Sequence, residues 1–215
     1  MIILASDGNE AILANGRCFR QDTGKLGPDH TPQFLPPHYF QQEADDGKFG
    51  ALATPVGFDW DGDGKEDLIC GNSAGYISFI KNLGSCIPSL QSSNTPAIRW
   101  AAPKYLEADG KVIRIMAGPN GSIQGPCEAK WGYTTQTVSD WDGDGVPDII
   151  ANSIWGKVVW FRNIGTRTQP KLAAAQPVEV EWNDAQPTLA YGWLKPEGKA
   201  LLTQWRTTPA TIDWN

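Results

Sequence analysis

The stretch Asp59-Trp60-Asp61-Gly62-Asp63-Gly64-Lys65-Glu66-Asp67 decides the fold class, because it returns almost unchanged as Asp140-Trp141-Asp142-Gly143-Asp144-Gly145-Val146-Pro147-Asp148. Each copy places carboxylates at alternate positions of a turn that is rich in glycine. Alternation on a tight turn directs these carboxylates toward one point, and hard oxygen ligands on a flexible loop suit Ca²⁺. The sequence therefore predicts two complete calcium-binding loops.

The predicted ligands are the side chains at loop positions one, three, five and nine, together with the backbone carbonyl at position seven. In the first loop these are Asp59, Asp61, Asp63, Lys65 and Asp67, and in the second they are Asp140, Asp142, Asp144, Val146 and Asp148. An EF-hand is excluded, because its closing Glu at position twelve is replaced by Cys70 and Ala151. The alternative is an acidic turn that binds no metal. We disfavour it because like charges ~4 Å apart cost about 1 kcal/mol per pair even in water.

The similarity between the two copies continues beyond the loops. Residues 59–84 align without a gap on residues 140–165, at an offset of 81, and Asn82 falls on Asn163. The repeating unit is thus a loop, a strand, a glycine-containing turn, a second strand and an Asn-x-Gly turn. Met1–Gly16 matches the second half of this unit, and Thr211–Asn215 resembles its beginning. We therefore expect the chain to be a segment of a longer protein.

The pattern D-W-D-G-D-G-x-x-D-[LI]-I, followed by a glycine turn, an aromatic strand and N-[LI]-G, resembles the FG-GAP/VCBS family of calcium-binding β-propeller repeats, which is related to integrin α-like blades. The resemblance covers Asp59–Gly84 and Asp140–Gly165, with a partial match at Met1–Gly16. It implies an all-β fold of β-propeller-type antiparallel blades, here an incomplete arc of about two to three blades. A β-sandwich is the alternative all-β interpretation.

The resemblance also implies where the strands of a blade lie. The metal loop joins a first strand at Thr54–Phe58 to a second at Asp67–Cys70, and a third follows at Tyr76–Lys81. A fourth is expected within Tyr105–Ile115, with a turn at Asp109-Gly110. We expect one incomplete propeller domain over residues 1–215. Its intervals are 1–50 (the end of one blade plus a long loop), 51–131 (the blade with the first calcium loop), 132–210 (the blade with the second) and 211–215 (the start of a further blade).

Composition excludes several classes of protein. The chain has 215 residues, a net charge of −6 and no Lys/Arg-rich run, which disfavours a nucleic-acid partner. It has no run of ~18 apolar residues, so no membrane span is predicted in this segment. The four cysteines have no C-x-x-C spacing, which excludes zinc and thioredoxin-like sites. Cys70 lies in an apolar run and is predicted to be a core residue, while the disulfide state of Cys86 and Cys127 stays open.

Three long connections join a predicted outer strand to the next inner one, at residues 22–49, 116–133 and 183–208. Because strands alternate in direction, these connections emerge on the face opposite the calcium loops. Loops of this length in a compact domain are usually functional or disordered, and their aromatic content favours function. The ligand-binding candidates are His38, Tyr39, Trp131 and Tyr133. The alternatives are ordinary surface histidines and a rim loop that packs between blades.

The sequence thus predicts a calcium-stabilised propeller segment of a secreted or cell-envelope protein, which binds carbohydrate or extracellular protein through its long loops. The alternative is the propeller of a carbohydrate-active enzyme, above all a polysaccharide lyase with His38 and Tyr39 among its acid and base candidates. No catalytic residue is assigned, and whether the chain is an enzyme is left open. The resemblance alone implies an extracellular, periplasmic or cell-surface location. A short arc leaves apolar blade faces uncovered, so the expected partners include the rest of the parent propeller or a second copy of the chain.

Overall fold

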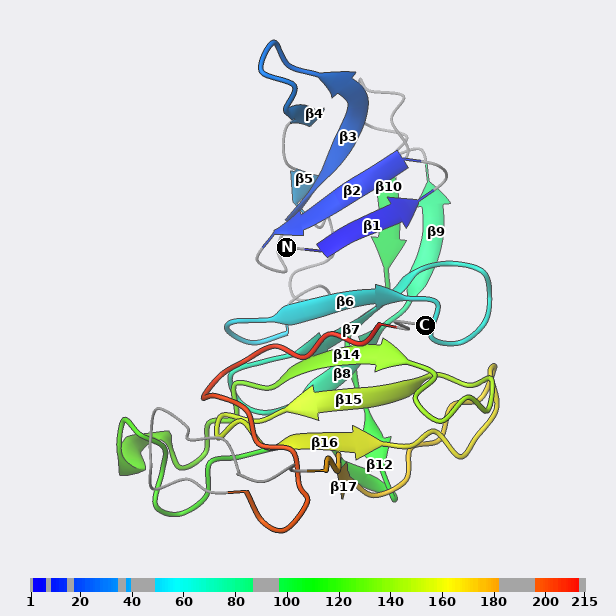
Figure 1. Cartoon of the computed structure of the whole chain (residues 1–215). Helices are drawn as coiled ribbons and strands as arrows, with labels where there is room; N and C mark the ends of the chain where they lie inside the picture. Colours follow the sequence, from blue (N-terminus) through cyan, green and yellow to red (C-terminus); the bar gives the residue numbers. More distant parts are fainter. Residues whose placement is uncertain are drawn as a thin grey trace.

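The fold consists of antiparallel β-sheets. The computed structural model describes residues 2–6, 9–14, 18–34, 38–39, 49–86, 97–181 and 196–212. These residues contain no α-helix, and a single 3₁₀ turn, η1, covers Pro126–Glu128. Three sheets of four or five strands follow one another along the molecule, together with two two-stranded ribbons (Figure 1). The prediction of an all-β, antiparallel fold is confirmed.

The first sheet has the strand order β1-β2-β3-β4, and β5 pairs with β3 as well. Its strands are β1 Ile2–Ser6, β2 Asn9–Ala14, β3 Cys18–Leu26, β4 Pro32–Phe34 and β5 His38–Tyr39. The Asp29 carboxylate accepts hydrogen bonds from Thr31 N and Oγ1 in the turn between β3 and β4. Both β4 and β5 fall inside the predicted long connection 22–49, so part of that connection is sheet rather than loop. These strands are too short to show the hydrophobic alternation that reveals a strand in a sequence.

The second and third sheets are the two complete copies of the repeat. The second contains β6 Thr54–Phe58, β7 Asp67–Gly71, β8 Ile77–Ile80 and β11 Lys104–Tyr105, and the third contains β14 Thr135–Ser139, β15 Asp148–Asn152, β16 Val158–Phe161 and β17 Gln176–Pro177. Every neighbouring pair in both sheets is antiparallel. The first three predicted strands agree with β6, β7 and β8 to within one residue at each end.

The predicted fourth strand, Tyr105–Ile115, is divided in the structure. Only β11 pairs with β8, whereas β12 Glu107–Ala108 and β13 Lys111–Val112 form a separate ribbon. The expected turn at Asp109-Gly110 joins the two strands of that ribbon, and both of its residues have positive φ, 50° and 71°. Two residues with positive φ form a tight hairpin turn. The chain reverses at this turn, so the residues after it do not continue the pairing with β8.

A second difference concerns the predicted Asn-x-Gly turn that ends each repeat. In the first copy the chain continues through it as β9 Asn82–Cys86, which pairs with β10 Ala97–Trp100. In the second copy the turn is present, because Asn163 Oδ1 accepts hydrogen bonds from Gly165 N at 3.0 Å and Lys171 N at 2.9 Å. The first Asn makes the corresponding bond to Gly84 N at 2.8 Å but does not end the strand.

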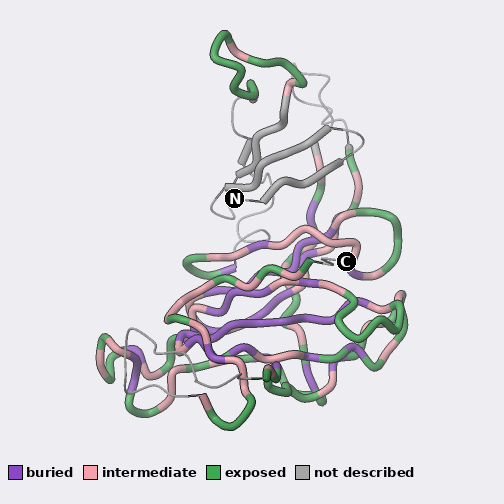
Figure 2. Tube along the Cα trace, viewed as in Figure 1, coloured by how far each residue is buried: buried purple, intermediate pink, exposed green. Residues whose placement is uncertain are grey.

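The largest hydrophobic cluster lies between the second and third sheets. Ile69 and Ile77 of the second sheet are fully buried in it together with Ile149 and Phe161 of the third, and Trp60 joins them from the first metal loop. Figure 2 shows the buried segments concentrated along the central strands and the exposed ones at the loops. Successive residues of a strand face opposite sides, so the neighbours of Ile69 fill a different cluster. That cluster contains Leu68, Cys70 and Ile80 with Phe49 and Trp100, which confirms Cys70 as a core residue.

A buried amide side chain crosses the contact between the second and third sheets, which we call the seam. The Gln136 side chain of β14 is 1% exposed, and its Nε2 donates to the backbone oxygens of Thr54 and Ile69. Gly71 makes room for this amide, because a Cβ at that position would lie 2.3 Å from Gln136 Oε1. In addition, Thr54 Oγ1 donates to Thr134 O at 3.1 Å. These bonds pair the Gln136 amide and the Thr54 hydroxyl inside the seam, as burial favours, whereas the buried Thr134 hydroxyl has no hydrogen-bond partner among the described residues.

The other side of the third sheet makes a similar seam with the segment 207–212. Thr135, at the position equivalent to Thr54, donates from Oγ1 to Thr207 O at 2.8 Å. The amide in this seam comes from Asn152 of β15, whose Nδ2 donates to the same Thr207 O at 2.9 Å. The contact between the third sheet and residues 207–212 thus resembles the contact between the second and third sheets, with a threonine hydroxyl and a side-chain amide donating to backbone oxygens.

The described strands pair in open, linear orders, so they close neither a barrel nor a ring of blades. Within the same residues, no helix has the length and apolar character that a membrane crossing needs.

Candidate metal centre

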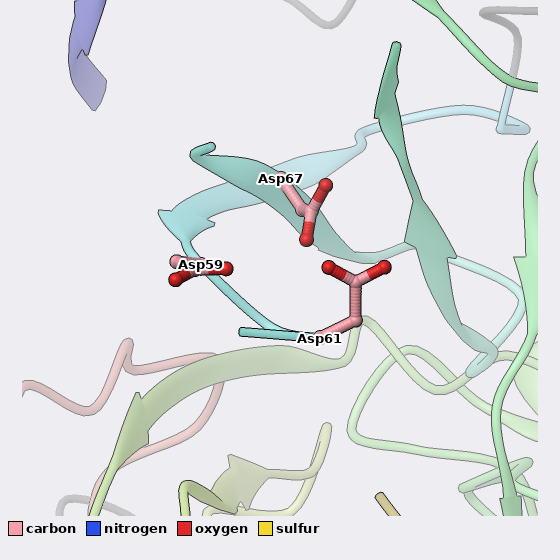
Figure 3. Close-up of side chains that lie close together, drawn as sticks. All are labelled: Asp59, Asp61 and Asp67. Carbon is pink, nitrogen blue, oxygen red and sulfur yellow. The ribbon is translucent and has the colours of Figure 1, made fainter. Parts of the chain in front are cut away.

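The first loop connects β6 to β7 and brings three carboxylates together. Asp59 directly follows β6, Asp61 lies in the turn, and Asp67 is the first residue of β7. One oxygen from each lies within 4.8 Å of the other two, and Figure 3 shows the three carboxyl groups facing a shared space. Gly62 and Gly64 have φ of 73° and 85°, a conformation that glycine adopts without steric cost and that folds the turn around this space.

Asp67 fixes the loop to the sheet. Its side chain is fully buried, and its two oxygens accept hydrogen bonds from Trp60 N at 3.1 Å and Asn82 N at 2.8 Å. Burial is the main cause that raises the pKa of Asp67 to about 6. A nearby cation favours the ionised form of a carboxyl group, so the charge of Asp67 is coupled to whatever cation the loop holds.

Two carboxylate oxygens in this loop have no hydrogen-bond donor. Asp59 Oδ1 and Asp61 Oδ1 are both buried and unpaired. A buried carboxylate oxygen without a partner costs free energy, which a cation beside it would offset. The donor set consists of oxygen atoms alone, which suits Ca²⁺ or Mg²⁺ rather than Zn²⁺ with its preference for nitrogen and sulfur. The residues present therefore fit a hard divalent cation.

Two basic side chains contact the outer oxygens of the same carboxylates. Lys81, just beyond β8, forms ion pairs with Asp61 and, at 2.9 Å, with Asp63. Arg167, from the second repeat, lies 3.1 Å from Asp59 Oδ2 through NH2 and donates through NH1 to Trp60 O at 3.0 Å. Lys81 is the main cause that lowers the pKa of Asp63 to about 2. The loop is thus partly neutralised from outside, while the unpaired Oδ1 atoms stay available.

The second loop, between β14 and β15, gathers Asp140, Asp142 and Asp144, and all three are exposed. Asp140 accepts hydrogen bonds from Asp144 N at 3.0 Å and Gly145 N at 2.9 Å. Arg162, at the position equivalent to Lys81, bridges Asp142 at 2.6 Å and Asp144 at 3.2 Å. A basic side chain at the same position of the repeat therefore pairs with the carboxylates of each loop.

Asp148 plays the same anchoring part in the second loop as Asp67 in the first. It is fully buried and accepts hydrogen bonds from Trp141 N at 3.1 Å and Asn163 N at 2.6 Å. Burial raises the pKa of Asp148 above its ordinary value.

The structure brings together three of the four predicted carboxylates in each loop. Asp63 is outside the first group and pairs with Lys65 and Lys81, and Asp148 is outside the second group. Both residues stay predictions as ligands, and so do the carbonyl groups of Lys65 and Val146. The final residues of the predicted third loop, 213–215, lie outside the described part of the chain.

Two of the four predicted ligand-binding residues lie at the end of the sheets opposite the metal loops. The Trp131 and Tyr133 rings are 5.4 Å apart, and the Arg206 guanidinium carbon lies 3.4 Å from the centre of the Tyr133 ring. Arg206 also pairs at 2.8 Å with Glu128, whose side chain is 3% exposed. Burial is the main cause that raises the pKa of Tyr133. The connections 116–133 and 196–208 therefore meet at an aromatic and ionic cluster.

The other two candidates lie on a different sheet. His38 and Tyr39 form β5, where their backbones pair with Phe19 and Cys18, and their side chains lie outside the described part of the structure. Cys127 is an exposed free thiol, so the structure contains no disulfide between it and Cys86.

Sequence reasoning missed several residues of these sites. Lys81 and Arg162 had a usable signal, because a basic residue recurs at the same position of the repeat next to an acidic loop. Arg167, Glu128 and Arg206 had none, since the ion pairs of Arg167 with Asp59 and of Arg206 with Glu128 join segments distant in sequence. Comparison of the chain with protein-family models, with curated proteins and with solved structures gives no match.

Proposed function

We propose that the chain is a calcium-stabilised segment of an FG-GAP/VCBS-type β-propeller in a secreted or cell-envelope protein. It binds carbohydrate or protein through the connections opposite the calcium loops. The observation that carries the metal part is the pair of buried oxygens Asp59 Oδ1 and Asp61 Oδ1, which have no donor and lie beside Asp67. Two acidic loops at equivalent places in two sheets support the same conclusion, because a chance acidic turn would not recur with its anchoring hydrogen bonds.

The repeated seam supports a blade-like arrangement. Ile69 and Ile77 of the second sheet are buried by the third sheet. Their equivalents, Ile150 and Val158, line an apolar groove of about 510 Å³ together with residues 207–211. A further blade, from the parent protein or from a second copy of the chain, would cover this groove as the third sheet covers the second.

Calcium titration tests the metal proposal. With millimolar calcium and dissociation constants of tens of micromolar, each ion should add roughly 2–3 kcal/mol to the free energy of unfolding. Isothermal calorimetry should find two ions per chain, and thermal melting in EGTA should occur well below melting in calcium. Asp61→Asn and Asp142→Asn should each remove one ion, and the double variant should remove both.

The matched control is Glu107→Gln, which removes an exposed carboxylate from β12, away from both loops. It should bind two ions and melt as the unaltered protein does. The metal proposal would be rejected if the unaltered protein melted at the same temperature in calcium and in EGTA and calorimetry found no heat of calcium binding.

The enzyme alternative stays a prediction, because the side chains of its acid and base candidates, His38 and Tyr39, lie outside the described part of the structure. A binding role needs only the exposed aromatic surface of Trp131 and the polar groups around it.

A further inference from the structure

Among the described residues, the end of the sheets opposite the acidic loops is positively charged. Four described segments make up this loop face: residues 72–76, 114–133, 152–157 and 203–208. They are tied together by hydrogen bonds, because Gly132 N donates to Ser73 O at 2.8 Å, Trp155 Nε1 to Ala117 O at 2.9 Å and Thr203 N to Gly156 O at 2.8 Å. The loop face is thus one continuous surface.

The loop face contains four basic side chains, Arg114, Lys130, Lys157 and Arg206, and one acidic side chain, Glu128. Glu128 neutralises Arg206 at 2.8 Å, and Glu197 neutralises Lys157 at 2.8 Å from outside the face. Arg114 and Lys130 remain, and both are exposed without a carboxylate partner among the described residues.

The two cations are linked through the backbone next to the exposed Trp131, because Arg114 NH2 donates to Lys130 O at 3.5 Å. The Arg114 guanidinium lies 4.8 Å from the centre of the Tyr76 ring, and its Nε donates to Ala74 O at 3.3 Å, which holds the side chain against the sheet. Lys130 directly precedes Trp131, whose side chain is 45% exposed and stacks obliquely on Tyr133. A pre-positioned cation beside an exposed indole offers ion pairing and ring stacking to one ligand.

Buried groups hold this surface in shape. Glu128 accepts hydrogen bonds from Ser122 Oγ and from Tyr133 Oη, the latter at 3.4 Å, besides pairing with Arg206. Tyr133 and Arg206 both have positive φ, 45° and 55°, which is uncommon for residues with side chains. Backbone conformations of this kind cost free energy and cluster at binding sites.

We infer that the loop face binds an acidic polysaccharide, with Trp131 stacking on a sugar ring and Arg114 and Lys130 pairing with its anionic groups. The inference rests on the proposed carbohydrate-binding function and specifies its ligand class. Sugar rings stack on indole through their apolar faces, and separate anionic groups along a glycan match separate cations. A nucleic acid is disfavoured, because its dense phosphate charge calls for a larger basic surface than two cations on an acidic chain.

The test is calorimetric binding in calcium to four ligands of similar length: oligogalacturonides (carboxylate), sulfated dextran (sulfate), dextran (neutral) and oligouridylate (nucleic acid). At least one of the two acidic glycans should bind, and dextran and oligouridylate should bind at least about tenfold more weakly. The two acidic glycans distinguish carboxylate from sulfate as the group recognised. Binding should weaken as salt is added.

The double variant R114Q/K130Q should lower the affinity for the acidic glycan about tenfold, because charge-assisted contacts are lost. The matched control K104Q/K171Q removes the same charge from exposed lysines outside the loop face and should leave the affinity unchanged. Trp131→Ala should also weaken binding. Since Arg114 contacts the backbone, Lys130→Gln alone provides a variant whose folding is not in question, and melting in calcium checks them all.

Three results would overturn the inference. Equal binding of dextran and acidic glycans, unaffected by R114Q/K130Q, would reject the acidic ligand while leaving carbohydrate binding in place. If oligouridylate bound most tightly, the ligand would be a nucleic acid and the acidic polysaccharide would be rejected. Absence of binding to every glycan would reject carbohydrate binding itself, and calcium titration of the same sample shows whether the metal part of the proposed function still stands.

Discussion

The two acidic loops have almost the same sequence but different surroundings. Trp60 of the first loop is 3% exposed, whereas Trp141 at the same position of the second is 47% exposed. Trp60 packs in the cluster between the second and third sheets, and Arg167 lies over the first loop, where it donates to Trp60 O. A Cβ on Gly62 would be 3.1 Å from Arg167 Cγ, whereas a Cβ on Gly143 would meet nothing within 4 Å. The following repeat therefore covers the first loop, whereas no described residue covers the second loop in the same way.

The largest expected effect concerns the two tryptophans. Trp60→Ala should lower the free energy of unfolding by about 3–5 kcal/mol, because it empties a site in the main hydrophobic cluster. Trp141→Ala should cost less than about 1 kcal/mol, since half of that side chain is already exposed. Urea denaturation of both variants in calcium measures the difference. Equal losses would mean that the second loop is also covered in solution, for example by a second copy of the chain.

The next effect is a pH dependence of the metal-free protein. The folded-state pKa of Asp67 is about 6, above the ordinary value of 3.8. Protonated Asp67 therefore contributes stability that is fully present below about pH 4 and is lost as the pH rises through about 6. The loss should be roughly 2–3 kcal/mol.

Urea denaturation in EDTA at several pH values measures this loss. Excess calcium should abolish it, because a bound cation favours the ionised carboxylate. Asp63, with its pKa lowered to about 2, acts in a separate window, since its contribution is lost only as the pH falls from about 4 toward 2. Asp67→Asn should flatten the profile between pH 4 and 6. A profile that Asp67→Asn leaves unchanged would assign the dependence to other groups, such as Asp148.

The smallest expected effect compares the two arginines. Arg167→Ala should destabilise the metal-free protein by about 1–2 kcal/mol, because it removes a partly buried ion pair, a hydrogen bond to Trp60 O and the cover over the first loop. Arg162→Ala should cost at most about 1 kcal/mol, since its ion pairs are exposed. Both variants should bind calcium at least as tightly as the unaltered protein, because each removes a cation from a metal loop. Thermal melting in EDTA and calcium titration measure the two quantities, and weaker calcium binding by Arg167→Ala would show that the cover itself is needed for the metal.

Local pattern sufficed to predict the parts of the fold that depend on short stretches of chain. The acidic groups of both loops and the apolar run of β7 follow from residue pattern and the repeat offset, whereas the bounds of β6, β7 and β8 were expected from the family resemblance. The covering of the first loop by Arg167 depends on how two sheets pack, which no spacing reveals. The division of the fourth strand depends on a two-residue turn whose position was predicted but whose effect on pairing with β8 was not.

The amides in the two seams bear on whether the repeats could be interchanged. Gly71 and Asn152 occupy the same position of the repeat, but the first leaves space for Gln136 from the next sheet while the second supplies the amide itself. A repeat with Asn at position 71 would collide with Gln136, and one with Gly at position 152 would leave Thr207 O without its amide partner. The first seam therefore has no room for a side chain at position 71, whereas the second would lose one of two hydrogen bonds to Thr207 O. Exchanging the two repeats would cost most at the first seam, so the contacts between the sheets favour the present order of the repeats along the chain.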